Sequence, residues 1–148
     1  MIDGVHIKNI VRHNDERGYF AELMKKGEPG YHEIAQTSYA LTLPGVIKAF
    51  HFHDYSETWV VVRGSAQIVM YDGRENSKTK GETQVIEAGE ENPIVLSIPP
   101  RVAHGYRVRG DEPVGMLYHA GEAYDAGRKD QIGTIPFNSP DINFDWNS

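Results

Sequence analysis

The sequence contains no cysteine among its 148 residues. This absence excludes disulfides, thiolate zinc sites and thiol nucleophiles, and it permits a reducing compartment, so we expect the cytoplasm as the location. Positive charge is also scarce, since 15 Lys and Arg residues stand against 21 Asp and Glu residues and the formal net charge is −6. Nucleic-acid binders usually carry a basic stripe, so we expect no nucleic-acid partner.

Long apolar segments are missing as well. The N-terminal residues 1–6 lack the basic region and apolar core of a signal peptide, and no segment approaches the length of a bilayer span. We therefore expect neither export nor a membrane partner. The hydrophobic fraction of 39% and the charged fraction of 24% are ordinary for a soluble globular protein. The chain length suits a single domain, residues 1–148, with its own hydrophobic core.

Helical periodicity is weak throughout, and short segments of β-type residues recur instead. Turns that contain Gly and Pro separate these segments, for example at 26–30 and 89–93. Many short strands with such turns are typical of a β-sandwich or barrel. Residues 121–148 lack periodicity but carry apolar side chains, so we expect this tail to pack on the barrel as extended chain. The segments predicted as strands are Ile7–Arg12, Phe20–Met24, Glu33–Leu41, Val46–His53, Thr58–Arg63, Ala66–Asp72, Thr83–Glu87, Ile94–Ile98, Gly105–Arg109 and Val114–Ala120.

The segment with the most chemical information is 45–64. His51 and His53 are two residues apart, so on a strand both project to the same face. Glu57 follows across a turn, and His104 stands at the start of a later strand. Three imidazoles and one carboxylate that converge would suit Zn, Mn, Fe, Ni or Cu, with open positions for water or substrate. Alternatively, the histidines act as bases or hydrogen-bond donors in a polar pocket without a metal.

Aromatic residues gather around the same strands. They could form a stacking platform for a base or a sugar, or they could fill the core of the barrel. The residues concerned are Phe50, Phe52, Tyr55, Trp59, Tyr106 and Tyr118.

Segment 45–64 resembles the first cupin motif, in which a glycine, His-x-His, a glutamate and a second glycine stand at fixed spacing. The second cupin motif, Pro-x-Gly-x-x-His, is matched in part by Pro99 and His104, whereas Arg101 replaces its glycine. The resemblance implies an all-β fold, the cupin jelly-roll β-barrel or double-stranded β-helix, with an extended C-terminal tail. The residues that match the first motif are Gly45, His51, His53, Glu57 and Gly64.

A second and more specific resemblance extends along nearly the whole chain. Five segments are similar, in the same order, to the motifs of the dTDP-4-dehydrorhamnose 3,5-epimerase family of sugar-nucleotide enzymes. Each motif alone is a weak signal, but five in one order are hard to produce by chance. The segments are Asp15–Glu22 (Asp-x-Arg-Gly-x-Phe-x-Glu), Gly45–His51 (Gly-Val-x-Arg-Gly-x-His), Asp72–Gly81 (Asp-x-Arg-x-x-Ser-x-Thr-x-Gly), Ile98–Gly105 (Ile-Pro-x-Gly-x-Ala-His-Gly) and Leu117-Tyr118.

This resemblance implies an isomerase that requires no cofactor. A histidine removes the acidic proton next to the 4-keto group of a nucleotide-linked 6-deoxy sugar, and a tyrosine reprotonates the opposite face. His51 matches the base and Tyr118 the acid. The resemblance also implies that the segment around 17–22 reaches the cleft of a neighbouring subunit. Exposed strand edges likewise favour a homodimer. The further residues expected to contact the nucleotide sugar are Arg17, Phe20, Glu22, Gln36, Ser38, Lys48, His104 and Tyr124.

The chain departs from the family pattern in three places. Glu57 stands where these epimerases carry a lysine that supports the developing enolate, and Lys48 replaces an arginine. The sequence also ends before the aspartate that orients the base in the family, so we expect His51 to lack that partner. A metal on His53, Glu57 and His104 could replace the lysine as electrophile. If His51 were a fourth ligand, it could not also be a free base.

The leading interpretation is a sugar-nucleotide epimerase of deoxysugar or polysaccharide biosynthesis that acts at C3, C5 or both. The alternatives are a metal-dependent cupin enzyme that acts on another small molecule and a non-catalytic cupin that binds a sugar or its nucleotide. Hydrolase and dehydrogenase interpretations have no support, because the sequence contains no Gly-x-Ser-x-Gly elbow, phosphate loop or dinucleotide fingerprint.

Overall fold

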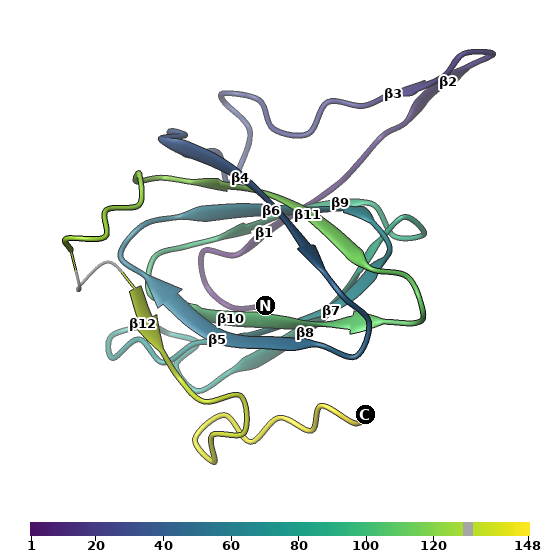
Figure 1. The fold of residues 1–148 in the computed structure, drawn as a ribbon. Coiled ribbons are helices and arrows are strands. Elements are labelled where there is room, and N and C mark those ends of the chain that lie inside the picture. Colours follow the sequence, from purple (N-terminus) through teal and green to yellow (C-terminus); the bar gives the residue numbers. More distant parts are fainter. Residues whose placement is uncertain (129–131) are drawn as a thin grey trace.

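The computed structural model describes residues 1–128 and 132–148. Two five-stranded antiparallel sheets pack face to face, and a two-stranded hairpin stands apart from them (Figure 1). The β6 sheet has the order β1-β9-β6-β11-β4, and the β5 sheet has the order β12-β5-β10-β7-β8. The strands are β1 His6–Asn9, β2 His13–Asp15, β3 Gly18–Phe20, β4 Gln36–Thr42, β5 Ile47–His53, β6 Glu57–Arg63, β7 Ser65–Tyr71, β8 Thr83–Gly89, β9 Ile94–Ile98, β10 Ala103–Arg109, β11 Val114–Ala120 and β12 Ile132–Thr134.

The main core lies between the two sheets. On β7, every second residue belongs to it, namely Ala66, Ile68 and Met70, as expected for a strand with one face against the opposite sheet. Leu96 and Ile98 on β9 follow the same period of two. The side-chain alternation of these short strands therefore holds the two layers together.

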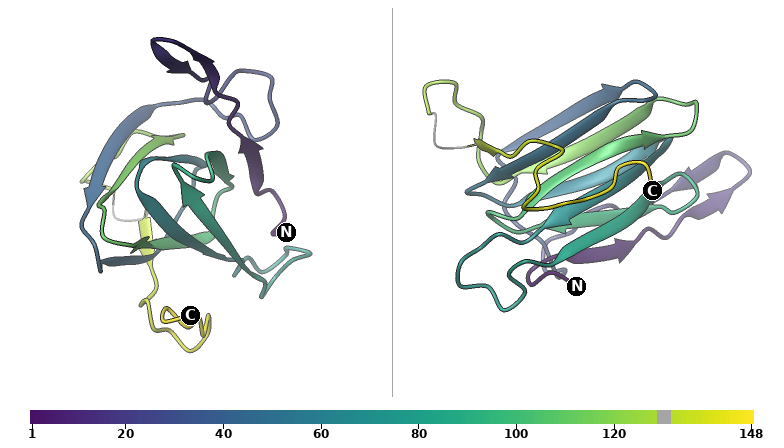
Figure 2. Two further views of the ribbon diagram at one scale, coloured as in Figure 1. Left: turned by 90° about the vertical axis from the view of Figure 1, so that its right-hand side faces the viewer. Right: turned by 90° about the horizontal axis from the view of Figure 1, so that it is seen from below.

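The other face of the β5 sheet is covered by the C-terminal tail (Figure 2, right). Phe50 is fully buried there, and its ring centroid lies 5.6 Å from that of Trp146. Ile142 belongs to the same buried cluster, and the backbone of Ile135 exchanges two hydrogen bonds with that of Phe50. The expected packing of the tail is confirmed, although the short strand β12 within it had no signal in the sequence.

The hairpin of β2 and β3 projects beyond both sheets (Figures 1 and 2). The strand predicted at Phe20–Met24 is wrong, because β3 ends at Phe20 and the next strand along the chain, β4, begins at Gln36. The strand predicted at Ile7–Arg12 is shortened to β1, because its ladder with β9 ends at Asn9.

The other eight predicted strands correspond to β4 through β11, and their ends differ from the predictions by at most three residues. The antiparallel two-sheet arrangement confirms the all-β jelly-roll fold. No helix among the described residues has the length and apolar character needed to cross a membrane.

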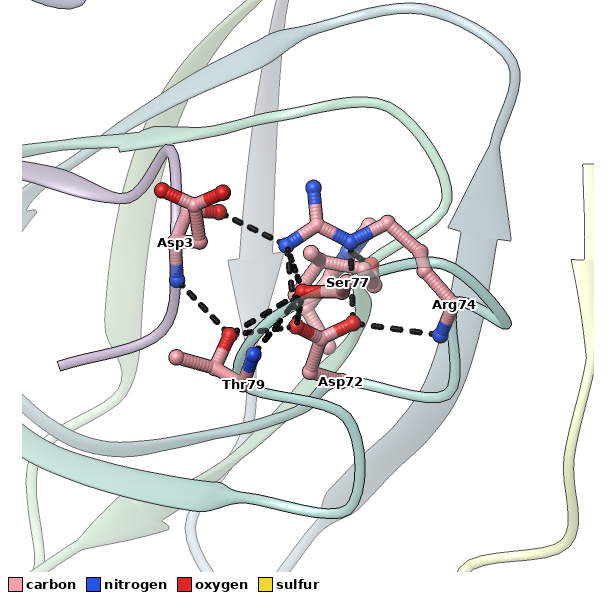
Figure 3. Close-up of polar contacts among 7 residues, drawn as sticks. Asp3, Asp72, Arg74, Ser77 and Thr79 are labelled. Carbon is pink, nitrogen blue, oxygen red and sulfur yellow. Dashed lines mark hydrogen bonds and ion pairs between the residues drawn. The ribbon is translucent and has the colours of Figure 1, made fainter.

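A buried carboxylate organises the turn between β7 and β8 (Figure 3). Asp72 is fully buried and accepts hydrogen bonds from Arg74 Nε at 2.8 Å, Ser77 Oγ at 2.6 Å and Thr79 Oγ1 at 2.6 Å. Arg74 also donates to the carbonyl oxygen of Asp3, and Thr79 Oγ1 accepts from the backbone N–H of Asp3. The Arg74 guanidinium, followed by the two hydroxyls, holds the pKa of Asp72 well below its usual range. This motif therefore folds the turn and anchors the N-terminus.

Candidate active site

A cavity of about 200 Å³ lies between the sheets at the strands that carry the histidine motif. Both sheets contribute to its walls, so its composition depends on how the sheets pack and not on one segment. Its lining residues are Ala40 on β4, Lys48, His51 and His53 on β5, Glu57 and Trp59 on β6, His104, Gly105 and Tyr106 on β10, Met116 and Tyr118 on β11, and Ile132 on β12.

Strand β5 presents His51 and His53 to the cavity, as their spacing predicted. Lys48 lies three residues before His51, so regular alternation would turn it to the opposite face. The residues of β10 that pair with Lys48 and His51 are only two apart, and the extra β5 residue forms a bulge. This bulge brings Lys48 onto the cavity face.

Gly105 on β10 accommodates the bulge. A Cβ atom at this position would overlap the side chain of Ala49 and lie 2.7 Å from the carbonyl oxygen of Lys48. Because those atoms belong to the backbone or lie next to it, they cannot move aside cheaply. The glycine after His104 in the motif is therefore required by the approach of β5.

Three charged or ionisable side chains converge at one end of the cavity. Glu57 Oε2 lies 3.1 Å from His104 Nε2 and 3.4 Å from His53 Nδ1. All three residues are buried, and one ligand atom from each lies within 4.8 Å of the others. His104 Nδ1 donates to the carbonyl oxygen of Val102 at 2.9 Å, which directs Nε2 toward Glu57. Of the four predicted metal ligands, the structure groups these three, and His51 lies outside the group.

The protein environment tunes these groups. Burial lowers the pKa of His53 to about 4. Partial desolvation, together with the nearby His104, lowers the pKa of His51, so its ring is neutral at pH 7, as a base requires. Burial alone would raise the pKa of Glu57, but His104 and His53 outweigh it and lower that pKa. The cavity therefore combines a neutral base with a buried anion.

The residue that replaces the glycine of the second cupin motif adopts a glycine-like backbone. Arg101 has a φ of 65°, in the left-handed region, and its backbone N–H donates to the carbonyl oxygen of His53 at 2.6 Å. Its guanidinium pairs with Asp54 and lies 5.7 Å from the centroid of the Phe52 ring. Arg101 therefore adopts a left-handed backbone and ties the loop before β10 to the end of β5.

Tyr118, the predicted acid, is half-buried and lines the cavity from β11. His51 lines it from β5, in the opposite sheet. A base and an acid on opposite walls can act on opposite faces of a ring held between them. Among the described residues, no side chain hydrogen-bonds to the His51 ring.

Three further predicted contacts form a hydrogen-bonded group next to the cavity. Gln36 and Ser38 alternate with Ala40 along β4, and Gln36 Nε2 donates to Ser38 Oγ at 3.1 Å. The backbone N–H of Tyr124 donates to Gln36 Oε1 at 2.8 Å, while the Tyr124 side chain is exposed. None of the three lines the cavity, although their neighbour Ala40 on β4 does.

The structure does not bring Arg17, Phe20 and Glu22 to the cavity of their own chain. Arg17 lies at the exposed hairpin and pairs with Asp15 at 2.7 Å. Phe20 is 64% exposed, and Glu22 pairs with Lys25 at 3.1 Å. All three side chains are exposed to solvent.

The aromatic residues divide between two environments. Trp59 and Tyr106 line the cavity and also pack in the main core, whereas Phe50 and Phe52 pack under the C-terminal tail. Tyr55 stacks on His53, with ring centroids 4.8 Å apart. Prediction from sequence missed four lining residues, which carry no polar side chain or lie on the unexpected strand β12: Ala40, Gly105, Met116 and Ile132.

Known proteins resemble the chain over its whole length. The sequence model of the family described as dTDP-4-dehydrorhamnose 3,5-epimerase matches residues 1–148. The chain is 46% identical over 149 residues to the spore coat polysaccharide biosynthesis protein SpsL of Bacillus subtilis, with 100% of this chain and 98% of that protein covered. It is 32% identical over 157 residues to a dTDP-4-dehydrorhamnose 3,5-epimerase of Methanothermobacter thermautotrophicus, with 98% and 80% covered.

Among solved structures, a dTDP sugar isomerase from Desulfovibrio desulfuricans superposes with a TM-score of 0.89 at 25% identity, with 99% of this chain and 92% of that chain covered. The full-length family match confirms what the five ordered motifs indicated. The chain belongs to the dTDP-4-dehydrorhamnose 3,5-epimerase family of sugar-nucleotide isomerases.

Proposed function

We propose that residues 1–148 form one cupin domain that epimerises a nucleotide-linked 4-keto-6-deoxy sugar. The observation that carries this proposal is the placement of His51 and Tyr118 on opposite walls of one cavity. The similarity to SpsL supports a role in polysaccharide biosynthesis. The absence of cysteine supports a cytoplasmic location.

The chemistry is a proton transfer in two steps. Neutral His51 removes the proton from the carbon next to the keto group, and the electron pair left behind delocalises onto the keto oxygen as an enolate. The Tyr118 hydroxyl then donates a proton to the opposite face of the same carbon. The configuration inverts, and no electron acceptor or cofactor is needed.

Lys48 is the only lining side chain with a fixed positive charge among the residues that the structure describes. A cation beside a developing enolate or a phosphate stabilises it strongly when water is excluded. Since Glu57 occupies the place of the family lysine, Lys48 supplies the positive charge on the β5 side of the cavity.

The cavity is sized for part of the substrate. Its volume of about 200 Å³ is below the roughly 300–1,000 Å³ of typical small-molecule pockets. We therefore place the sugar ring inside and the nucleotide outside, next to Gln36, Ser38 and Tyr124.

We also propose a homodimer in which the β2–β3 hairpin of each chain reaches the cavity of its partner. On the edge strand β4, the side chains of Tyr39 and Leu41 are 57% and 50% exposed, and an uncovered apolar edge strand favours association. The projecting hairpin carries Arg17 and Phe20 away from their own cavity. A partner chain would give both features a contact.

The proposed reaction is tested by incubating the protein with dTDP-4-keto-6-deoxyglucose in heavy water. We expect deuterium at C3, C5 or both, and mass spectrometry with NMR identifies the position. No incorporation, with or without added metal, would remove this substrate assignment.

The shared site is tested by mixing two inactive variants, Arg17→Ala and His51→Ala. If the hairpin serves the partner's cavity, half of the randomly mixed dimers are heterodimers with one intact site, and activity returns to about a quarter of the wild-type rate. No recovery, or a monomer by light scattering at micromolar concentration, would contradict the shared dimer.

A further inference from the structure

We propose that the outer face of the β5 sheet carries a binding site for a neutral carbohydrate of one or two sugar rings. The site is a cavity of about 670 Å³ between the sheet and the turn that joins β7 to β8. This volume lies within the roughly 300–1,000 Å³ of typical small-molecule pockets and exceeds that of the candidate active site. We call it the outer cavity, and its lining includes Phe52, Tyr71, Arg74, Asn76 and Arg101.

The outer cavity is separate from the candidate active site, although both use the same two strands. On β5, Phe52 lines the outer cavity, whereas its neighbours His51 and His53 line the cavity between the sheets. On β10, Ala103 and His104 divide in the same way. The alternation of side chains therefore places the two cavities on opposite faces of one sheet, and each can be occupied on its own.

The floor of the outer cavity is apolar. Tyr71 and Ala103 are paired residues of β7 and β10, and Phe52 and Ile135 complete the floor. The Arg101 guanidinium lies 5.7 Å from the centroid of the Phe52 ring, so we take the half-buried Tyr71 ring as the stacking surface. The apolar C–H face of a sugar ring can lie flat on such a ring.

The charged side chains around this floor are already paired within the protein. Two of the lining charges are positive and two are negative. Because these charges cancel, the outer cavity has no net field to attract an anion or a cation. A neutral ligand leaves every pair in place, so the lining favours it over a phosphate or a carboxylate. The four pairs are Arg74 with Asp72, Arg101 with Asp54, Asp3 with Lys78 and Glu75 with Lys80.

The rim still offers hydrogen-bonding groups to a ligand. Arg74 makes its side-chain hydrogen bonds through Nε and Nη2, and its Nη1 points away from them (Figure 3). Arg101 pairs with Asp54 through Nη1, which leaves its Nε and Nη2 without a hydrogen bond to the described residues. The exposed Asn76 amide likewise has no partner among them, and it can both donate and accept. Each hydroxyl of a sugar also donates and accepts, so a carbohydrate matches this rim.

The test is a titration of the ¹⁵N-labelled full chain followed by two-dimensional NMR, because backbone amide shifts both detect and locate weak binding. The probes are methyl α-L-rhamnopyranoside and cellobiose, which are neutral, and inorganic phosphate, which is an anion. We expect at least one of the two sugars to shift the amides of residues 73–77 and 101–103 saturably, with a Kd on the order of 1 mM. Phosphate should leave these amides unshifted at the same concentration.

Five variants locate the sugar. Asn76→Ala and Arg101→Gln each remove hydrogen-bonding groups from the rim, and Tyr71→Leu removes the aromatic ring from the floor. Each of these three should raise the Kd of the sugar by about 3- to 10-fold. His51→Ala should leave the Kd unchanged, because His51 faces the other cavity. Asn9→Ala removes an exposed asparagine from β1, in the opposite sheet, and is the matched control for Asn76→Ala.

The same spectra check the fold of every variant. Because Asn76 is exposed, Asn76→Ala keeps the test valid if a variant of the floor unfolds. No shift at residues 73–77 and 101–103 with either sugar up to about 50 mM, or an unchanged Kd in every folded variant of the rim and floor, would overturn the site.

Two further results would also contradict the proposal. Tighter binding of phosphate than of either sugar at these residues would overturn the neutral class of ligand. Loss of sugar binding in His51→Ala would place the sugar in the cavity between the sheets instead. The readout needs no turnover, so the outer cavity and the proposed epimerase reaction can fail independently.

Discussion

Two buried carboxylates in this molecule have opposite surroundings. Asp72 is fully buried, and its oxygens accept hydrogen bonds from Arg74, Ser77 and Thr79 (Figure 3). Glu57 is nearly as buried, yet its Oε2 faces two imidazoles and has no hydrogen-bond partner among the described residues. A satisfied polar network stabilises a fold, whereas an unsatisfied one is retained where a ligand or substrate completes it. We therefore assign Asp72 to the fold and Glu57 to the proposed active site.

The largest expected effect on stability separates these two roles. Asp72→Asn should lower the free energy of unfolding by about 3–5 kcal/mol, because it breaks a buried ion pair and leaves Arg74 without its charged partner. Glu57→Gln should lower that energy by less than Asp72→Asn does, because Glu57 pairs only with two imidazoles, at 3.1 Å and 3.4 Å. Urea unfolding of both variants measures the difference. Equal losses would contradict the division of roles.

Acid should reveal the same difference. Arg74 lowers the pKa of Asp72 in the folded state. The stabilisation is therefore complete above the unfolded pKa of about 3.9 and is lost as pH falls below that value toward the folded pKa. Between pH 7 and a pH below 4, the urea midpoint of unfolding should fall more steeply for the wild type than for Asp72→Asn. Parallel curves for the two proteins would show that Asp72 does not carry this dependence.

Tyr118→Phe sharpens the functional side of the comparison. It removes only the hydroxyl needed for reprotonation, so the rate of epimerisation should fall by about 100-fold or more. Stability should change little, because the substitution keeps the aromatic ring that packs against the main core. A change of less than about threefold would point to water or Tyr124 as the proton source instead.

Gly105→Ala tests the backbone that positions the site. The new Cβ would collide with the bulge on β5, so we expect a loss of about 1–3 kcal/mol in stability. KM should also rise, because the bulge places Lys48 in the cavity. Gly121→Ala is the control, since its Cβ would meet no atom closer than 3.4 Å. Similar behaviour of the two variants in urea unfolding would contradict the steric account.

The smallest effect is expected at a third carboxylate, which is exposed. Glu75 pairs with Lys80 at 2.8 Å on the surface, where solvent screens the interaction. Glu75→Gln should leave both the unfolding midpoint and the epimerisation rate unchanged within error. A clear loss in either measurement would show that burial does not separate these carboxylates in the way we describe.

Sequence alone predicted the parts of the fold that local alternation determines. Strands β4 through β11 follow apolar periodicity, and the two-residue spacing of His51 and His53 correctly placed both in one cavity. The β2–β3 hairpin had no such signal, because its strands have three exposed residues each. β12 is equally short, and only its pairing with β5 makes it a strand.

The candidate site was predictable only in part, for a related reason. Asp72 binds partners two to seven residues away, so its motif can be recognised in sequence. Glu57 meets its neighbours from β5 and β10 only after the two sheets pack. Lys48 reaches the cavity through a bulge that regular alternation does not predict. The exclusion of His51 from the three-ligand group likewise depends on distances that spacing does not give.

The most direct test of the account is the rate at which His51→Ala incorporates solvent deuterium into dTDP-4-keto-6-deoxyglucose. If His51 is the base, the rate should fall by at least about 100-fold relative to the wild type, while His13→Ala keeps the wild-type rate. The circular dichroism spectrum of His51→Ala should match that of the wild type. A folded His51→Ala protein that exchanges deuterium within about threefold of the wild-type rate would contradict the assignment of this cavity as the epimerase active site.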